Sequence, residues 1–250
     1  MRLDLALVEA GLARSRTQAA RLIAAGRVRV NGRTADKPAQ PVTGEDELHL
    51  SEPDPWVSRA AHKLLGALAD LELHPAGRAL DAGVSTGGFT QVLRHLGCAP
   101  VYAVDVGHGQ LADPVRHDPG VIVHEGLNLR DLQPAHLDHR PVDWVVADVS
   151  FISLTLLLEP LFGVLDDRGT ALLMVKPQFE VGRAKLGKHG VVTDPEAREA
   201  AVDTVCAAAA ELGWFEHGRV PSRVPGPAGN VEYFVRLRRE SKDTDQPETS

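Results

Sequence analysis

The sequence has few of the features that mark secreted, membrane or metal-binding proteins. Its two cysteines, Cys98 and Cys206, are too few for a disulfide framework and lack the partners of a zinc site. Its eleven histidines are scattered, without the i, i+4 pairing of a metal-binding helix. The N-terminal residues lack the apolar core of a signal peptide, and no apolar run approaches the ~20 residues that span a bilayer. We therefore expect a cytoplasmic protein with reduced thiols, no metal and no membrane segment.

Charge is distributed unevenly along the chain. The whole sequence carries a net charge of −7, whereas residues 1–37 hold eight basic and three acidic residues and carry +5. A small basic segment on an acidic body is the asymmetry expected when one module binds an anionic polymer. A solvated basic surface is the alternative interpretation.

Residues 1–50 have the pattern of a small α/β module. Leu3, Leu7 and Val8 share one face of a predicted first helix, and Ser15 is the expected N-cap of a second helix over residues 16–25. Short strands are predicted at residues 28–30 and 48–50. The following residues, 51–57, include two prolines and predict a linker between domains.

From residue 58 onward, predicted helices and strands alternate. A helix over residues 58–71 comes first, and a long alanine-rich helix follows Pro195. The strand patterns cover residues 79–82, 101–106, 121–124, 143–147 and 171–175, and helical stretches lie between them at 89–96, near 111, at 132–137 and at 154–165. This alternation predicts a doubly wound parallel sheet.

The C-terminal part of this domain adds two more predicted strands, at residues 214–220 and 232–237. The loop that joins them is too short for a crossover helix, so we expect the last strand to be antiparallel to its neighbour. The domain would then cover residues 58–239. The polar residues 240–250 predict a disordered tail.

The segment "DAGVSTGGF", residues 81–89, follows a predicted strand and opens a helix. Gly83 permits a tight turn, and Gly87 and Gly88 permit close approach of the backbone. Asp105 ends the next strand, 22 residues after Gly83, where a carboxylate can accept hydrogen bonds from a ribose diol. Together these features predict a nucleoside-type cofactor at the carboxyl ends of the strands, although the glycine-rich segment alone also fits a plain strand–helix turn.

Four charged residues are expected to meet at the same edge of the sheet. Asp148 and Lys176 each follow a buried strand, and Pro177 prevents that second strand from continuing. Glu232 begins the antiparallel last strand, so its start lies at this edge too. Lys63 lies on the helix that precedes the sheet and can reach across. Chance placement of four charges is the alternative to a catalytic site.

These segments resemble known families. Residues 1 to about 50 resemble the S4 RNA-binding domain, and "DAGVSTGGFT" resembles motif I of class I methyltransferases. The Lys–Asp–Lys–Glu set resembles the tetrad of the FtsJ/RrmJ-like 2′-O-ribose methyltransferases. The segments "DVGHGQL", "ADVSFISL", "VKPQFEVG" and "GPAGNVEYF" extend the similarity to the TlyA family over nearly the whole chain, residues 1 to about 240.

The resemblance implies a class I, Rossmann-like methyltransferase domain with a mostly parallel seven-stranded sheet, preceded by a small S4-like α/β RNA-binding domain. It implies S-adenosyl-L-methionine as cofactor and the cytidine 2′-hydroxyl of ribosomal RNA as the methylated group. Lys176 would orient the 2′-oxygen and assist its deprotonation, Asp148 would hold Lys176, and Lys63 and Glu232 would position the ribose.

The remaining site residues follow from the same motifs and from the basic segments. The candidate cofactor-binding residues are Asp81, Gly83, Ser85, Thr86, Gly87, Gly88, Asp105, Asn128 and Asp148. The candidate RNA-binding residues are Arg2, Arg14, Arg16, Arg21, Lys37, Arg59, Arg183, Lys185 and Lys188. Ribosomal RNA or a ribosomal subunit is the expected partner of a monomeric protein, and the sequence leaves open which subunit is methylated.

Two positions depart from the family pattern. His108 stands where a tyrosine is usual, and Asp113-Pro114 is expected to interrupt the helix that follows.

Three other functions compete with the main hypothesis: a small-molecule methyltransferase, a membrane-active haemolysin, and a non-catalytic RNA-binding or ribosome-assembly factor. The tetrad and the basic segment disfavour a small-molecule methyltransferase, and the tetrad also disfavours a non-catalytic RNA-binding or ribosome-assembly factor. A haemolysin would need an amphipathic or membrane-spanning segment, which the sequence lacks.

Overall fold

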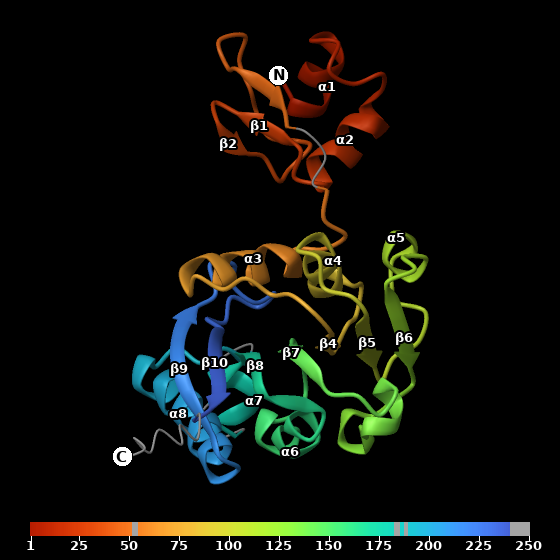
Figure 1. Ribbon diagram of the computed structural model, residues 1–250. Helices are drawn as coiled ribbons and strands as arrows, with labels where there is room; N and C mark the ends of the chain where they lie inside the picture. The colour runs from red at the N-terminus through yellow and green to blue at the C-terminus, as the bar shows by residue number, and fades with distance from the viewer. Residues whose placement is uncertain (52–54, 183–185, 188–189, 241–250) are drawn as a thin grey trace, which may run out of the picture. The chain divides into compact units, whose positions relative to one another are not determined.

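The computed structural model describes residues 1–51, 55–182, 186–187 and 190–240, and its contacts divide the chain between Pro55 and Trp56 (Figure 1). The first unit contains the predicted basic module and the second contains the predicted α/β domain. The expected tail beyond residue 240 and the middle of the expected linker, residues 52–54, lie outside the described residues.

The first unit packs two helices on a three-stranded sheet of order β2-β1-β3. Leu3, Leu7, Ile23 and Val28 form its buried core, in agreement with the predicted helix faces. Ser15 caps the second helix as predicted, because its Oγ accepts a hydrogen bond from the backbone N–H of Gln18 at 3.2 Å. The elements are α1 (Leu3–Glu9), α2 (Arg16–Ala24), β1 (Val28–Val30), β2 (Arg33–Thr34) and β3 (Leu48–Leu50).

The second unit is built on a seven-stranded sheet of order β6-β5-β4-β7-β8-β10-β9. The five strands from β6 to β8 are parallel, and β10 is antiparallel to both β8 and β9. The predicted doubly wound, mostly parallel seven-stranded sheet is therefore confirmed. Its strands are β4 (Ala79–Ala82), β5 (Val101–Asp105), β6 (Val121–Glu125), β7 (Val142–Ala147), β8 (Leu165–Val175), β9 (Trp214–Pro221) and β10 (Tyr233–Arg239).

Helices cover both faces of this sheet (Figure 1). One face packs against α3 and α4 through a core that includes Leu64, Phe89, Leu172 and Phe234. The other face packs against α6 and α8. The helical elements are α3 (Ala60–Asp70), α4 (Gly88–His95), α5 (Asp113–Arg116), α6 (Leu158–Phe162), α7 (Pro177–Glu180) and α8 (Pro195–Glu211), with 3-10 turns η1 (Leu129–Asp131), η2 (Pro134–Leu137) and η3 (Leu154–Leu156).

The topology places a crevice beside β4. The chain winds outward from β4 through β5 to β6, and then returns to the other side of β4 to form β7 and β8. The loops after β4 and β7 therefore diverge, and ligands of doubly wound sheets bind in the crevice at such a switch point.

Several predicted elements differ from those observed. In place of the helix expected over residues 132–137 there is only the 3-10 turn η2, which begins at Pro134, a residue with no N–H to continue a helix from the preceding residues. The helix expected over residues 154–165 is split into η3 and α6. Strand β8 begins at Leu165, before the predicted start at Ala171. The prediction began too late because residues 166–168 are polar and show no alternation of apolar residues. Asp113 and Pro114 do not interrupt a helix but open α5, where proline is tolerated in the first turn.

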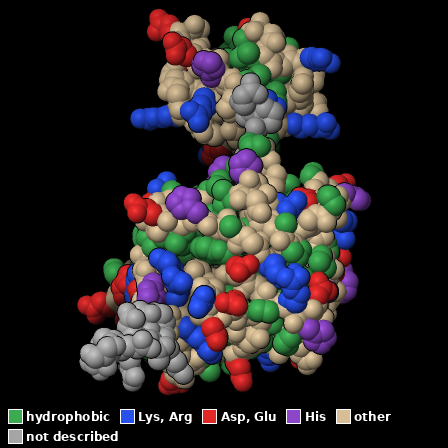
Figure 2. Space-filling model, in the orientation of Figure 1, with side chains coloured by type: hydrophobic (Ala, Val, Ile, Leu, Met, Phe, Trp, Pro, Cys, Tyr) green, Lys and Arg blue, Asp and Glu red, His purple; other side chains and the backbone are tan. Residues whose placement is uncertain are grey.

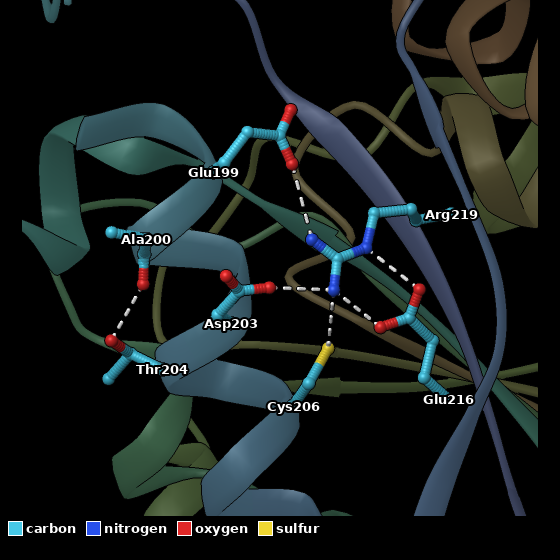
Figure 3. A network of polar contacts seen from close by, with 7 residues as sticks. All are labelled: Glu199, Ala200, Asp203, Thr204, Cys206, Glu216 and Arg219. Atoms are coloured by element: carbon cyan, nitrogen blue, oxygen red, sulfur yellow. Dashed lines mark hydrogen bonds and ion pairs between the residues drawn. The ribbon is translucent and has the colours of Figure 1, made fainter. Parts of the chain in front are cut away.

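A cluster of ion pairs around Arg219 joins α8 to β9 (Figure 3). Arg219 of β9 pairs with Glu199 and Asp203 of α8 at 3.2 and 2.8 Å, and with Glu216 of its own strand at 2.6 Å. The hydrogen bonds with Glu216 raise the pKa of Arg219, and those with Arg219 lower the pKa of Glu216. The cluster is therefore charged at neutral pH and stabilises the docking of α8.

Candidate active site

Two adjoining pockets open at the carboxyl edge of the parallel strands. The first, which we call the Asp105 pocket, has a volume of about 500 Å³ and includes Asp105 and Asn128. The second, the Lys176 pocket, has a volume of about 410 Å³ and includes Lys176. The two pockets share Gly83, Ser85, Asp148 and Ser150. A molecule bound in one pocket can therefore meet a molecule bound in the other beside Asp148.

The glycine-rich turn after β4 separates the two pockets. Gly83 has φ +87°, and a Cβ at this position would lie 2.7 Å from the carbonyl oxygen of Asp148, so glycine is needed here. The carboxylate of Asp105 accepts hydrogen bonds from the N–H groups of Ser85 and Gly107, both at 2.8 Å. Asp105 thus ties the turn to the end of β5 and also lines the Asp105 pocket. Asn128 lines the same pocket, and its side chain accepts a hydrogen bond from the N–H of Arg130 at 3.1 Å.

The other residues of the turn have different surroundings. Thr86 lines the Lys176 pocket, whereas Gly87 and Gly88 line neither pocket. A Cβ at Gly88 would lie 2.3 Å from Ser58 Oγ, and one at Gly87 would lie 2.8 Å from the side chain of Leu111. Close packing against neighbouring segments is therefore the structural reason for these two glycines.

Asp81 is a buried carboxylate that lines the Lys176 pocket and has only 1% of its surface exposed. One oxygen accepts a hydrogen bond from Thr90 Oγ1 at 2.6 Å, and the other has no hydrogen-bond partner among the described residues. Burial raises the pKa of Asp81 to about 7, and the nearby carboxylates of Asp148 and Asp105 add to this effect. A cationic group in the pocket would complete its interactions.

The four predicted catalytic residues lie together as two ion pairs in the Lys176 pocket. Lys63 Nζ lies 2.6 Å from Glu232 Oε2, and Lys176 Nζ lies 2.5 Å from Asp148 Oδ1. Glu232 is fully buried and both lysines are nearly so. Buried charges need such partners, because an unpaired ion loses its hydration without compensation.

The sheet register explains this convergence. Asp148 and Lys176 are the first residues after the parallel strands β7 and β8. Strand β10 pairs with β8 so that Tyr233 lies opposite Val175, and Glu232 and Lys176 therefore flank the same end of the ladder. Glu232 lies just before the strand and does not begin it, a difference of one residue from the prediction.

Sequence reasoning missed Ser150, whose Oγ accepts a hydrogen bond from Lys176 Nζ at 2.8 Å. It also missed α7 and the role of Glu180. Glu180 Oε2 accepts a hydrogen bond from Ser153 Oγ at 2.5 Å and Oε1 accepts one from the N–H of Leu154 at 2.9 Å, while burial raises the pKa of Glu180. Helix α7 therefore holds the segment that follows Asp148, residues 148–153, which we call the Asp148 loop. No sequence pattern marks these contacts, since each joins residues about 26 positions apart.

Phe151 is the aromatic residue of the Asp148 loop. It is 91% exposed, has φ +65° and lies 5.2 Å, between ring centroids, from Phe179 of α7. A positive φ is unusual for a residue with a Cβ, and an exposed phenyl ring gains little from burial. The loop thus presents an aromatic surface at the mouth of the Asp105 pocket, which Phe151 also lines.

The predicted RNA-binding residues fall into three groups. In the first unit, Arg2 and Arg16 pair with the buried Asp4 at 2.9 and 3.1 Å, and their contacts hold the pKa of that carboxyl well below its usual range. Arg14, Arg21 and Lys37 are exposed and form no such ion pair with another described residue, and Figure 2 shows Lys and Arg side chains on several sides of this unit. In the second unit, Arg59 lines the Lys176 pocket. Arg183, Lys185 and Lys188 lie outside the described residues.

Metal-binding clusters and membrane-spanning helices are both absent from the part of the chain that the structure describes. No group of three or more His, Cys, Asp or Glu side chains there is arranged to hold a metal ion. None of the helices in those residues is both long and apolar enough to cross a membrane.

Known proteins resemble this chain in both units. The FtsJ-like methyltransferase family model matches residues 56–239, and the S4 domain model matches residues 1–48. The 16S/23S rRNA (cytidine-2′-O)-methyltransferase TlyA of Mycobacterium tuberculosis is 51% identical over 243 residues, which cover 96% of this chain and 90% of that protein.

Solved structures give the same result for the fold. The structure of a hemolysin-named protein from Streptococcus thermophilus has 37% identity and a TM-score of 0.74, covering 96% of this chain and 89% of that one. An S-adenosylmethionine dependent methyltransferase from Mesorhizobium loti shares the fold of the second unit, with a TM-score of 0.53 and 16% identity over 71% of this chain and 98% of that chain.

Proposed function

The chain belongs to the TlyA family of FtsJ-like methyltransferases with an N-terminal S4 domain, and from this premise we propose that it methylates the 2′-hydroxyl of a cytidine in ribosomal RNA. The observation that carries this proposal is the meeting of two pockets at Asp148, with the Lys–Asp–Lys–Glu tetrad in one of them. One pocket suits a nucleoside cofactor and the other suits the ribose of the target. We place the activity in the cytoplasm, where ribosomal RNA is available.

The residues present fit S-adenosylmethionine. In our proposal Asp105 accepts hydrogen bonds from the ribose diol and Asn128 lies beside the adenine. Asp81 lines the Lys176 pocket together with Gly83 and Ser85, and its unpaired oxygen would accept a hydrogen bond from the α-ammonium group. When bound, the cofactor supplies a methyl group on a sulfonium sulfur, and that methyl would lie beside Asp148.

Lys176 is positioned to act on the attacking oxygen. Asp148 and Ser150 occupy two of the three hydrogen-bonding directions of its Nζ, so the third is left for the 2′-hydroxyl. Once Lys176 has lost a proton to solvent, its amine would accept the proton of the 2′-hydroxyl, whose oxygen bonds to the methyl carbon while the electron pair of the broken C–S bond stays on the cofactor sulfur. The carboxylate of Asp148, 2.5 Å away, then stabilises the resulting ammonium group until its proton passes to solvent.

The second ion pair has a positioning role. Lys63 Nζ can donate to the ribose while Glu232 holds the lysine at 2.6 Å, and Arg59 at the pocket rim can meet an adjacent phosphate. Alignment of this kind lowers a barrier by roughly 7–11 kcal/mol when reacting groups are held in line. The exposed basic residues of the first unit would hold the rest of the RNA.

A pair of substitutions at Lys176 tests this function. Lys176→Ala should lower turnover on ribosomal subunits by roughly 10²–10⁴-fold, the usual contribution of a positioned acid or base. Lys176→Arg keeps a positive charge beside Asp148 but does not give up a proton, so it should be nearly as inactive. The measurement is transfer of labelled methyl groups to subunits from cells that lack the protein, followed by mapping of 2′-O-methylated cytidines.

Two controls make the result specific. Calorimetry with S-adenosylhomocysteine should give both variants an affinity within about twofold of the wild-type value, since Lys176 lies outside the Asp105 pocket and our proposal gives it no contact with the cofactor. More than a tenth of wild-type turnover in Lys176→Arg would exclude the proton-accepting role. Identical 2′-O-methylation maps with and without the protein would exclude the function itself.

A further inference from the structure

Three arginines line a hollow at the edge of the sheet opposite the tetrad. Its volume is about 380 Å³, and its lining includes Arg168 of β8 together with Arg236 and Arg238 of β10. Because β10 is antiparallel, Tyr233 lies at the tetrad edge, next to Val175, and the strand carries Arg236 and Arg238 away from it. The hollow is therefore separate from both pockets of the candidate active site and shares no residue with them.

Arg236 is the distinctive residue of this hollow. Its side chain is half-buried, its Nε is fully buried without a hydrogen-bond acceptor, and no carboxylate among the described residues forms an ion pair with it. Burial and the neighbouring guanidinium of Arg238 lower the pKa of Arg236. A cation in such surroundings is destabilised unless an anion joins it.

Arg238 and Arg168 have donors to spare as well. The Nε of Arg238 is also buried without an acceptor, and its Nη2 donates to the backbone oxygen of Arg168 at 3.1 Å. Neither arginine forms an ion pair with a carboxylate of the described residues. Three guanidinium groups thus face one hollow with incomplete hydrogen bonding.

Three carboxylates, those of Glu72, Asp143 and Asp166, also line the hollow, and none of them forms an ion pair with its arginines among the described residues. Asp143 accepts from the backbone N–H of Arg78 at 2.8 Å, and Asp166 accepts from that of Arg168 at 2.9 Å. Arg239, the next residue of the strand, shows the ordinary arrangement, because it pairs with Asp167 at 2.6 Å. The lack of a counter-ion is therefore particular to the hollow and not general to β10.

We propose that this hollow binds a phosphate group and, if the proposed function holds, that the phosphate belongs to the backbone of the ribosomal RNA. The guanidinium group presents a planar fork of donors that matches the oxygens of a phosphate. A phosphate would supply acceptors for the unpaired donors and the negative charge that Arg236 lacks. The site would be a second RNA contact of the methyltransferase unit, outside the methyl-transfer centre.

Arg236→Gln and Arg239→Gln form a matched pair for the test. Both remove one positive charge from β10, but only the first removes the unpaired guanidinium of the hollow. In the first arm, the melting temperature of the full-length protein is measured in inorganic phosphate and in chloride at equal ionic strength. Wild type and Arg239→Gln should be stabilised by phosphate, and Arg236→Gln should lose that stabilisation.

In the second arm, binding of ribosomal RNA is titrated at several salt concentrations. Arg236→Gln should reduce the log–log salt slope by about 0.7–0.9, the value of one lost phosphate contact, and Arg239→Gln should reduce it less. Turnover at saturating RNA and affinity for S-adenosylhomocysteine should stay at the wild-type level in both variants. If Arg236→Gln folds poorly, Arg236→Met removes the same charge with an apolar side chain of similar length.

The outcomes separate the parts of the proposal. Equal behaviour of the two variants in both arms would overturn the phosphate site. Loss of phosphate stabilisation with an unchanged RNA slope would support a site for a small phosphate ligand and overturn the assignment to RNA. The phosphate arm needs no RNA, so it stands even if the proposed methylation fails.

Discussion

At the scale of single residues, the charged groups of the site are distinguished by their partners. Lys63, Lys176 and Glu232 are buried in ion pairs, so their charges are compensated before any ligand arrives. Asp81 is the exception, since one of its buried oxygens has no partner among the described residues. Its protonation should therefore respond to the cofactor more than that of the paired groups.

We predict that cofactor affinity rises with pH through the titration of Asp81. Its pKa in the folded protein is about 7, above the ordinary value of 3.8 for an aspartate, so the carboxyl is mostly neutral at pH 6 and mostly ionised at pH 8. If only the ionised form binds the α-ammonium group, the dissociation constant of S-adenosylhomocysteine should be roughly tenfold larger at pH 6 than at pH 8. Calorimetry at the two pH values measures this ratio.

The stability of the cofactor-free protein should show the opposite dependence. Because folding raises the pKa of Asp81, its contribution to stability is fully present below about pH 4 and is lost as the pH rises through 7. Asp81→Asn should remove both effects. A wild-type affinity that does not change between pH 6 and pH 8 would show that Asp81 does not contact the ammonium group.

At the scale of secondary-structure elements, the site depends on a short helix that follows Lys176 directly. Helix α7 holds the Asp148 loop through the two hydrogen bonds of Glu180 and the contact between Phe179 and Phe151. The loop carries Asp148 and Ser150, the two partners of Lys176. Strand β8 thus supplies the lysine, and its continuation fixes the residues that surround it.

We predict that Glu180→Ala destabilises the protein and misaligns the site. It leaves the N–H of Leu154 and the hydroxyl of Ser153 without their acceptor, which costs about 1–3 kcal/mol of unfolding free energy. Turnover should fall while affinity for S-adenosylhomocysteine changes little. Denaturant unfolding and methyl transfer measure the two effects.

Glu159→Ala is the matched control for this prediction. Glu159 is an exposed residue of α6 that forms no side-chain hydrogen bond or ion pair with another described residue. Its loss should leave stability and turnover unchanged. Equal effects of the two alanine variants would mean that α7 does not hold the Asp148 loop.

At the scale of the whole molecule, we propose that the first unit supplies most of the affinity for RNA and that the second unit carries out the chemistry. Each unit has its own hydrophobic core, and the contacts divide the chain between Pro55 and Trp56. The basic charge is concentrated in the first unit, whereas the tetrad and both pockets lie in the second.

We predict that residues 56–250 alone fold and bind S-adenosylhomocysteine with the affinity of the full protein. Their KM for ribosomal subunits should rise by tenfold or more, because a module that contacts several phosphates supplies much of the affinity for RNA. Turnover at saturating subunits should remain within about threefold, since the chemistry does not use the first unit. Circular dichroism, calorimetry and methyl-transfer kinetics on the truncated chain make the comparison. An unchanged KM would show that the first unit does not hold the RNA.

Local patterns in the sequence determined most of the architecture and the candidate tetrad. Apolar runs bounded by glycine, proline and polar residues marked the seven strands, and the short loop before Glu232 predicted the reversal of the last strand. Because parallel strands end at one edge of a sheet, the residues that follow them could be predicted to lie close together. The same logic did not detect β2 or α7, which are too short to show a period.

Only the tertiary structure decided several of the partners, although the resemblance had already implied that Asp148 would hold Lys176. The pairing of Lys63 with Glu232, the hydrogen bond from Lys176 to Ser150, and the placement of Arg236 without a counter-ion depend on register and packing. Such contacts join positions far apart in the chain, and their energies depend on burial and on distances of a few ångströms. Periodicity and motif spacing report only which edge or face a residue occupies, so the partners of each charge emerge when the sheet is assembled and its helices are packed.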